Sequence, residues 1–385
     1  MSSSIAVMES KFAEQYAETV KRSESSVLRH LRDEAFQFFE ENGFPTVKKE
    51  DWKYTNVSPI AKGDWLISAH NDLGTSVDGM FEHLFGKFNF ERNGFAALNQ
   101  AFADIVTITI PKETSSDKPI ELSFEPEIGT AIFPRVLIIA EAGSKSTIIE
   151  SYASLSGSFT NAAIQIVVDD NATLTHYRVQ RESGEAFHVG TTEVTLKRGS
   201  LYNSTNINLG GAISRHDIDL KFTNEGSEAF VDGLYMLNGA QHADTHSIID
   251  HLVPNCTSHQ SYRGVLNDRS RAVFNGKVFV REDAHGTDAQ QSNKNLLLSS
   301  EARVDTKPQL EIFNDDVKCS HGATVGQLEE EELFYLLTRG LPENLARNLL
   351  TYGFAEQIIN KIAIESVKKQ LDEAVLNRLN TNLGD

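Results

Sequence analysis

An internal repeat constrains the fold of this chain more strongly than any other feature of its sequence. Four apolar residues recur at an interval of 28 positions, each inside a segment of alternating apolar and polar residues: Ile138, Ile166, Val194 and Phe222. Each segment ends in a residue typical of turns, at Gly143, Asn171, Gly199 and Gly226. A second series of glycines keeps nearly the same period, at Gly157, Gly184, Gly211 and Gly239. A fixed period of this length indicates stacked supersecondary units that share one core.

The repeating unit contains strands and turns and lacks a helix. Such a unit cannot bury its apolar face alone, but stacked units enclose a continuous core. The pattern therefore predicts a mainly β protein whose core is a right-handed parallel β-helix, or β-solenoid. An antiparallel sandwich also has short strands with regular turns, and the register shared by four units favours the solenoid over it. Beyond residue 246 the units lengthen, and we expect an irregular register there, with Pro254 and Pro308 in the connections.

Helical patterns flank the repeat on both sides and predict three regions. Residues 1–104 form an N-terminal helical and mixed region, with apolar residues at helical spacing from about residue 8 to 42. Residues 105–325 form the β-helix core. Residues 326–385 form a C-terminal helical domain. Because a helical tail on a solenoid either caps its end or docks a partner, this last region is a candidate docking domain.

Composition argues against several classes of function. The 54 Asp and Glu residues outnumber the 36 Lys and Arg residues, which gives a net charge of −18. This acidic balance argues against binding to nucleic acid or to an anionic membrane surface. The N-terminus lacks an apolar run after a basic start, and no segment approaches the roughly 18 apolar residues of a membrane span. With two cysteines and no disulfide pattern, we expect a cytoplasmic protein with free thiols.

The common catalytic motifs are missing from the sequence. It contains no Gly-x4-Gly-Lys-Ser/Thr phosphate loop, no Gly-x-Gly-x-x-Gly, no Cys-x-x-Cys, no His-Glu-x-x-His and no Gly-x-Ser-x-Gly. These absences weigh against a nucleotide-dependent or hydrolytic enzyme.

One short segment places a thiol beside an imidazole where the β-rich region gives way to helices. Cys319 and His321 are two residues apart, so both side chains point to the same face of a strand. Both suit iron, zinc or an iron–sulfur cluster. Because such sites usually need four ligands, this pair would need a partner surface to complete its shell. The alternative is a pair at the end of a strand that binds nothing.

A second, weaker group of candidate ligands lies upstream. His242, Asp244 and His246 alternate along one predicted strand and project from one face at intervals of about 6.5–7 Å. His251, Cys256 and His259 follow soon after. One interpretation is a weak or shared metal site. We favour the other, a solvated outer face whose histidines form hydrogen bonds with their neighbours.

Several motifs, in order along most of the chain, resemble the SufB/SufD family of the SUF system for iron–sulfur cluster assembly. They are Glu50-Asp51-Trp52-Lys53-Tyr54-Thr55, Asn238-Gly239, Tyr262-Arg263-Gly264, Phe274-Asn275-Gly276-Lys277-Val278, Asn295-Leu296-Leu297-Leu298-Ser299, Pro308-Gln309-Leu310-Glu311-Ile312, the Cys-Ser-His-Gly-Ala-Thr-Val-Gly run at 319–326, and Phe334-Tyr335-Leu336-Leu337-Thr338-Arg339-Gly340. The last two are the most specific to the family. The Trp52 segment and the chain length resemble its SufD branch.

The resemblance implies a scaffold subunit with defined partners, which is not an enzyme and holds no cofactor tightly as an isolated chain. In this family SufB and SufD pair through their β-helices, and their C-terminal helices bind the ATPase SufC. The resemblance further implies a role in iron acquisition, and in nascent cluster formation at the subunit interface, to which His321 would contribute. A transient iron or cluster would then be shared with the partner. The implied SufC-docking residues are Leu333, Phe334, Leu336, Leu337, Arg339, Leu345 and Phe354.

Two other functions compete with this interpretation. A β-helix enzyme acting on polysaccharide would be secreted and would place acidic residues at one recurring position of the solenoid, and neither feature is present in the sequence. A purely structural solenoid without a metal role is the stronger rival. For the isolated chain, unpaired strand edges favour a homodimer.

Overall fold

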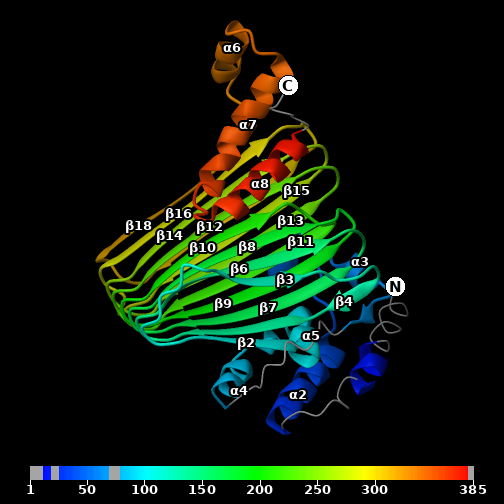
Figure 1. The fold of residues 1–385 in the computed structure, drawn as a ribbon, viewed down its shortest axis with the longest axis vertical. Helices are drawn as coiled ribbons and strands as arrows, with labels where there is room; N and C mark the ends of the chain where they lie inside the picture. The colour runs from blue at the N-terminus through cyan, green and yellow to red at the C-terminus, as the bar shows by residue number, and fades with distance from the viewer. Residues whose placement is uncertain (1–11, 19–25, 69–78, 380–385) are drawn as a thin grey trace.

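The computed structural model describes residues 12–18, 26–68 and 79–379. The molecule is mainly β, and its strands alternate along the chain between two sheets that wind into a solenoid (Figure 1). Every strand pair in the described residues is parallel, which confirms the predicted parallel solenoid and excludes the antiparallel sandwich.

From residue 134 onward, the two sheets take alternate strands of the solenoid. Within the described residues, sheet A contains β1 (Leu66–Ile67), β2 (Asp104–Ile110), β4 (Thr130–Ile132), β5 (Pro134–Ala140), β7 (Phe159–Val168), β9 (Phe187–Leu196), β11 (Ile213–Phe222), β13 (His242–His251), β15 (Arg271–Val280) and β17 (Arg303–Ile312). Sheet B contains β3 (Ile120–Phe124), β6 (Lys145–Ser154), β8 (Thr173–Glu182), β10 (Leu201–Asn208), β12 (Glu228–Leu237), β14 (Thr257–Leu266), β16 (Thr287–Leu297) and β18 (Val317–Gly326).

The register of sheet A follows the predicted repeat with one shift. Ile138 pairs with Ile166, and Ile166 pairs with Val194, as a period of 28 predicts. Val194 then pairs with Leu220 instead of Phe222, because the unit between β9 and β11 is two residues shorter. Since side chains alternate with a period of two, Phe222 still points into the core, where it is fully buried.

Two predictions for the later units are wrong. The units do lengthen beyond residue 246, but pairing continues residue by residue through β13, β15 and β17 and through β14, β16 and β18. The turns absorb the additional residues, so the register stays regular. Pro254 lies in a connection as expected, whereas Pro308 lies inside β17. β17 is the last strand of sheet A, and an edge strand tolerates a residue without an amide hydrogen.

Helices cover the outer faces of both sheets. On sheet A lie α2 (Ser26–Asn42), α4 (Gly79–Gly86) and α5 (Gly94–Phe102), and on sheet B lie α7 (Glu343–Ile359) and α8 (Glu365–Arg378). Short helical turns complete the N-terminal region: η1 (Glu50–Trp52), α3 (Ser58–Ala61) and η2 (Phe90–Arg92). By contrast, α6 (Glu330–Thr338) buries no residue and projects beyond the solenoid (Figure 1).

The predicted three-region division remains a prediction. Helical residues 12–18 and α2 account for part of the helix expected from about residue 8 to 42, and its other residues lie outside the described ranges. The N-terminal region also contributes β1 to sheet A through its pairing with β4. Across the described parts of the chain, no helix has the length and apolar character needed to cross a membrane.

The interior of the solenoid has an apolar side and a polar side. The apolar side carries stacked residues such as Val168, Leu196, Phe222 and Val280. The polar side contains ionisable groups that are paired, as buried charges must be. Nε2 of His176 lies 2.8 Å from Oε2 of Glu150, and Nδ1 of His188 lies 2.9 Å from Oε2 of Glu182.

Burial of neutral histidine predicts that acid destabilises the fold. His251 is fully buried and stacks on Phe222, with 4.3 Å between ring centroids, and burial lowers its pKa to about 4. In the unfolded chain its pKa is about 6.5. Between these values the unfolded state binds more protons, so the free energy of unfolding should fall as the pH falls. For this residue alone, the fall from pH 6.5 to pH 4 is at most about 3 kcal/mol.

Urea unfolding over this pH range tests the expectation. His251→Gln removes one titrating group and should show a shallower pH dependence than the wild type. His30→Gln is the control, because the His30 side chain is 73% exposed, and it should keep the wild-type dependence. The same pH dependence in all three proteins would contradict the assignment.

Candidate functional site

The last turn of the solenoid is open. Among the described residues, β17 ends sheet A and β18 ends sheet B, so one side of each strand has no strand to pair with. Ile312, Phe313 and Val325 are 41%, 55% and 48% exposed at this end. Unpaired edges with exposed apolar side chains are typical of a surface that pairs with another chain. We call β17, β18 and these three residues the open end.

Cys319 and His321 both lie on β18 at the open end. Cys319 is half-buried and packs against the solenoid core, whereas His321 is exposed. Because the two are separated by one residue on a strand, they share its inner face. In the register with β16, Cys319 lies opposite Ala289 and His321 lies opposite Gln291. The structure therefore brings the thiol and the imidazole together where the core meets the surface.

Two buried polar atoms in the last turns of the solenoid lack a hydrogen-bond partner among the described residues. They are Oε1 of Gln291, opposite His321, and Oγ1 of Thr306 on β17. Gln291 uses its Nε2 to donate to Oε1 of Gln260 at 2.6 Å, which leaves its own Oε1 unused. Buried polar groups are nearly always hydrogen-bonded, so these two atoms are exceptions beside the open end.

The protonation of Cys319 limits what it can do in the isolated chain. Burial raises the pKa of its thiol, partly offset by a hydrogen bond with the backbone of Ala289. The thiolate is the form that binds metals, so binding would have to release the proton. A lone thiol with one imidazole also falls short of the usual four ligands.

The weaker candidates His242 and His246 lie on the outer face of sheet A, beneath a segment of the N-terminal region. This segment, Glu50–Thr55, is called the strap. Thr55 Oγ1 donates to Oδ2 of Asp244 at 2.5 Å and lies 2.8 Å from Nε2 of His242. Nε2 of His246 lies 3.0 Å from Oδ1 of Asp244, whose side chain is 1% exposed. As expected, both histidines lie within hydrogen-bonding distance of neighbouring side chains. The expectation that this face is exposed to solvent is wrong, because the strap covers it.

Trp52 anchors the strap to the solenoid. Its ring stacks on Phe95 of α5, with 5.3 Å between centroids, and the guanidinium carbon of Arg215 lies 3.8 Å from its centre. Arg215 is buried and pairs with Asp217 and Asp244 at 2.8 Å each. Burial alone would lower the pKa of Arg215, but the two aspartates hold it above its usual value. The charge under the Trp52 ring is therefore permanent.

Cys256 and His259 do not join the other candidates. Cys256 is fully buried in the core, where its Sγ donates to the carbonyl of Pro254 at 3.4 Å, and burial raises its pKa. His259 lies on the other sheet, on β14, beside the ring of Phe230 at 5.4 Å. In the part of the chain that the structure describes, no three His, Cys, Asp or Glu side chains form a group that could hold a metal ion.

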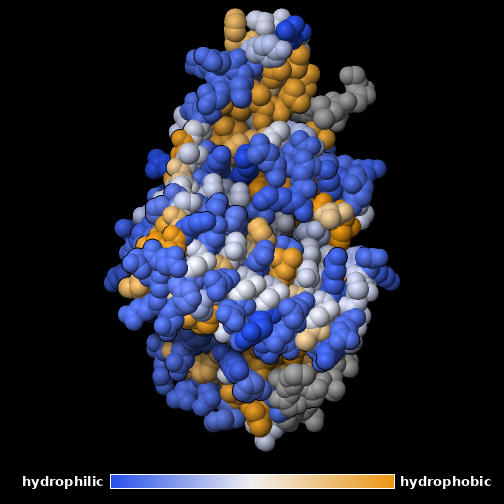
Figure 2. Space-filling view, turned by 90° about the vertical axis from the view of Figure 1, so that its left-hand side faces the viewer, coloured by the Kyte–Doolittle hydropathy of each residue, from blue (hydrophilic) through white to orange (hydrophobic). Residues whose placement is uncertain are grey.

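A second exposed apolar surface lies on α6 and the start of α7. Phe334 and Tyr335 are 67% and 56% exposed, and Leu337 and Leu349 are 37% and 42% exposed. Figure 2 shows apolar side chains gathered at this end of the molecule. We call these four residues the α6 surface. A short helix that buries no residue gains little stability from the rest of the chain.

The predicted docking residues divide into three groups. Phe334, Leu337 and Arg339 are exposed. Half-buried positions are Leu333, Leu336 and Leu345. Phe354 packs against the solenoid instead, with the Arg263 guanidinium carbon 4.6 Å from its ring.

These features define a class of protein: a β-solenoid with an open end, a thiol and an imidazole on its last strand, and a projecting helix. The profile described as "SUF system FeS cluster assembly, SufBD core domain" matches residues 124–354, and "SufBD protein N-terminal region" matches residues 7–82. The chain therefore belongs to the SufB/SufD family of iron–sulfur cluster assembly proteins.

Curated relatives agree with this assignment. The chain is 32% identical to the SufBD family protein slr0076 of Synechocystis sp., with 92% of each chain covered. It is also 32% identical to the iron–sulfur cluster assembly protein SufD of Escherichia coli, with 94% of each covered. SufD of Bacillus subtilis is 30% identical, with 68% of this chain and 61% of that protein covered.

Sequence reasoning missed the residues that hold the strap. Arg215, Asp217 and Asp244 were not connected with Trp52, because nothing in local spacing links positions more than 160 residues apart. One signal was available: charged residues alternate with apolar ones along β11, where a strand covered on both faces is usually apolar throughout.

Truncation of Trp52 should release the strap. Trp52→Ala removes a buried ring that is 3% exposed and its contacts with Phe95 and Arg215. It should lower the free energy of unfolding by about 3–5 kcal/mol, measured by urea denaturation. Tyr54→Ala is the matched control, since this aromatic residue of the strap is 44% exposed and should cost much less. Equal losses in the two variants would mean that Trp52 is not the anchor.

Proposed function

We propose that the chain is a non-catalytic scaffold subunit that pairs with a SufB-like paralogue and binds a SufC-like ATPase. In this proposal it supports iron supply and nascent cluster formation at the interface with the paralogue. One observation carries the proposal: the ligand pair Cys319 and His321 lies on β18, an edge strand of the open end. A site that is half complete at an unpaired edge fits a shell closed by a second chain.

The open end is the proposed site of pairing with the paralogue. Its two edge strands are each ten residues long, so a partner strand would find a long row of backbone hydrogen-bonding groups, interrupted on β17 by Pro308. The exposed Ile312 and Phe313 add apolar area that pairing would remove from water. In the absence of the paralogue, a second copy of the chain would occupy the same edges, which is the basis for the expected homodimer.

The α6 surface is the proposed site of ATPase binding. Phe334 and Leu337 are exposed and close in sequence, while Leu336 is half-buried. The sequence lacks a phosphate loop, so ATP hydrolysis would belong to the partner. The half-buried Phe354 contributes indirectly, since it packs the end of α7 onto sheet B.

Co-purification from the host tests the proposal as a whole. The complex would be isolated anaerobically through a tag on this chain and analysed for its protein components, iron and sulfide. Assembly with both partners, carrying iron and sulfide, is the expected result. Assembly without metal would favour the alternative, a purely structural solenoid. Isolation of the chain alone or only as a homodimer would contradict the proposed partners.

Replacement of His321 should reduce cluster formation while leaving the stability of the fold unchanged. His321→Ala removes an exposed imidazole at a strand edge, so the free energy of unfolding should change by less than about 0.5 kcal/mol. Cluster content of the assembled complex, measured by iron and sulfide analysis, should fall. His285→Ala, an exposed histidine in a connection, should have no effect. Wild-type cluster content in the His321→Ala complex would remove this residue from the ligand set.

A charge on the α6 surface should block ATPase binding. Leu337→Asp places an unpaired carboxylate in a contact that excludes water, at a cost of several kcal/mol. Binding of the purified ATPase, measured by calorimetry, should be lost while circular dichroism stays unchanged. Leu155→Asp is the control, because Leu155 is fully exposed in a turn. If both variants bind the ATPase equally well, the docking surface lies elsewhere.

A further inference from the structure

The sequence contains four Asn-Gly dipeptides, which begin at Asn42, Asn93, Asn238 and Asn275. An asparagine followed by glycine is prone to lose its side-chain amide, because the glycine has no Cβ to hinder the attack of its backbone nitrogen on the asparagine side chain. One of the four, Asn238-Gly239, is also a sequence motif that the proposed function leaves without a task. The fold determines which of the four dipeptides is free to react.

The first dipeptide is held at the end of a helix. Asn42 is the last residue of α2, and its Nδ2 donates to the carbonyl of Phe38 at 2.9 Å. The following amide, that of Gly43, donates to the carbonyl of Phe39 at 2.7 Å. The side chain that would be attacked and the nitrogen that would attack are therefore both engaged with the backbone of the helix.

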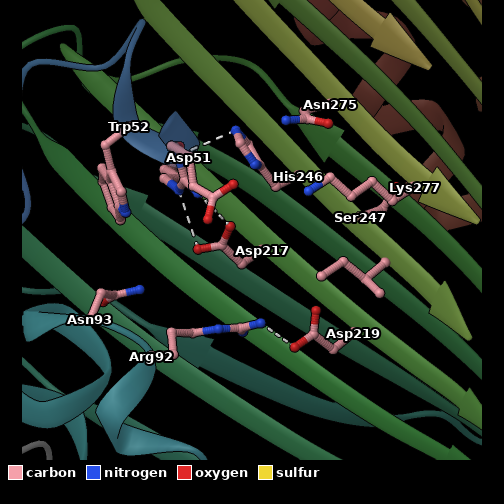
Figure 3. Close-up of a pocket in the computed structure, with 12 residues that line it drawn as sticks. Asp51, Trp52, Arg92, Asn93, Asp217, Asp219, His246, Ser247, Asn275 and Lys277 are labelled. Carbon is pink, nitrogen blue, oxygen red and sulfur yellow. Dashed lines mark hydrogen bonds and ion pairs between the residues drawn. The ribbon is translucent and has the colours of Figure 1, made fainter. Parts of the chain in front are cut away.

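Two further dipeptides are held beneath the strap, where both asparagines line a pocket on sheet A (Figure 3). Asn93 caps α5, and its Oδ1 accepts from the amides of Phe95 and Ala96 at 2.9 and 3.0 Å. Asn275 lies inside β15, and the next residue, Gly276, is buried in the same strand. Closing a ring at either position would first require local opening of the helix or the strand.

The remaining dipeptide lies in an exposed turn between β12 and β13. The amide of Gln241 donates to the carbonyl of Asn238 at 3.2 Å and closes this turn. Gly239 has a φ of 60°, in the region that favours glycine. Among the described residues, no atom beyond its chain neighbours lies within 4 Å of the place that a Cβ of Gly239 would take. No hydrogen bond of the Asn238 side chain is found in that part of the chain either.

A carboxylate receives the proton of the nitrogen that would attack. The amide of Gly239 donates to Oδ2 of Asp268 at 2.8 Å. Asp268 is exposed in the next turn of the stack, after β14. A group at hydrogen-bonding distance from the proton that it must take meets the geometric requirement for a general base. The Asn238–Gln241 turn also borders a hollow of about 540 Å³, which gives water access to it.

We propose that Asn238 is a deamidation site of this chain, with Asp268 as the proton acceptor. The backbone nitrogen of Gly239 gives its proton to Oδ2 of Asp268 and forms a bond to Cγ of Asn238. The C–N bond of the side-chain amide breaks, and its nitrogen takes up that proton and leaves as ammonia. Water then opens the resulting succinimide at either carbonyl, which yields aspartate or isoaspartate. The reaction consumes only water and changes no oxidation state.

The modified turn would be the one that receives the end of α8. Nη1 of Arg378, the last residue of α8, donates to the carbonyl of Met236 at 2.8 Å and to Oε1 of Gln241 at 3.3 Å. The same Oε1 accepts from the amide of Asn238 at 3.0 Å. Either product adds a negative charge to this turn, and isoaspartate also routes the backbone through the former side chain. The modification would thus act on a contact between α8 and the solenoid.

Peptide mapping of the full chain tests the proposal, with the other three dipeptides as internal controls. The folded protein is incubated at neutral pH for several weeks, digested at acid pH and analysed by mass spectrometry, and isoaspartate is verified by labelling with an isoaspartyl methyltransferase. Asn238 should convert at least about tenfold faster than Asn42, Asn93 or Asn275, a difference in barrier of about 1.4 kcal/mol. In urea the four should convert at similar rates. Conversion of Asn238 no faster than that of the other three in the folded chain overturns the proposal.

Replacement of Asp268 tests its part in the reaction. Asp268→Asn removes the proton acceptor and keeps a residue type that tolerates the φ of 53° at this position. Conversion of Asn238 should slow at least about tenfold. Asp268→Gly is a second variant that tolerates the same φ, and Asp117→Asn, at an exposed position, should convert as the wild type does. Circular dichroism verifies that each protein is folded. Wild-type conversion in both Asp268 variants would overturn the assignment of Asp268 as the acceptor.

Discussion

Parallel pairing of each strand with its equivalent in the next turn is the constraint on which the rest of this structure depends. The pairing stacks apolar side chains such as Val168 and Leu196 into one core. It also directs every second residue to an outer face that must be covered. Because the ladder has no internal stop, it leaves unpaired edges at the last turn. The core, the helical covers and the open end are consequences of that single pairing rule.

The same constraint explains how much the sequence could predict. Alternation with a period near 28 indicated a parallel solenoid, because each unit repeats the same physical requirement. Apolar residues at helical spacing indicated the helices on both sides of it. The shift at Val194 and Leu220 and the regular register around Pro308 were not predictable from spacing. Turns of different length can join strands in one register, so turn length does not report the register of the strands it connects.

The candidate site, too, could be predicted from the sequence only in part. Cys319 and His321 could be placed on one face because they are neighbours on one strand. The strap could not be predicted to cover His242 and Asp244, since that contact joins positions almost 190 residues apart. Charged residues on the outer face of sheet A appeared suited to solvent, yet they pair with one another beneath Trp52. Long-range packing thus decided whether those polar residues form a surface or an interior.

The scaffold interpretation makes the open end the part of the molecule that changes most on assembly. Hydrogen exchange of the backbone amides, compared for the chain alone and in complex with a SufB-like paralogue, measures this directly. The account predicts slower exchange concentrated in β17 and β18, because their unpaired N–H groups gain partners. Unchanged exchange in these two strands, with protection elsewhere, would contradict pairing through the open end and with it a shared site at Cys319 and His321.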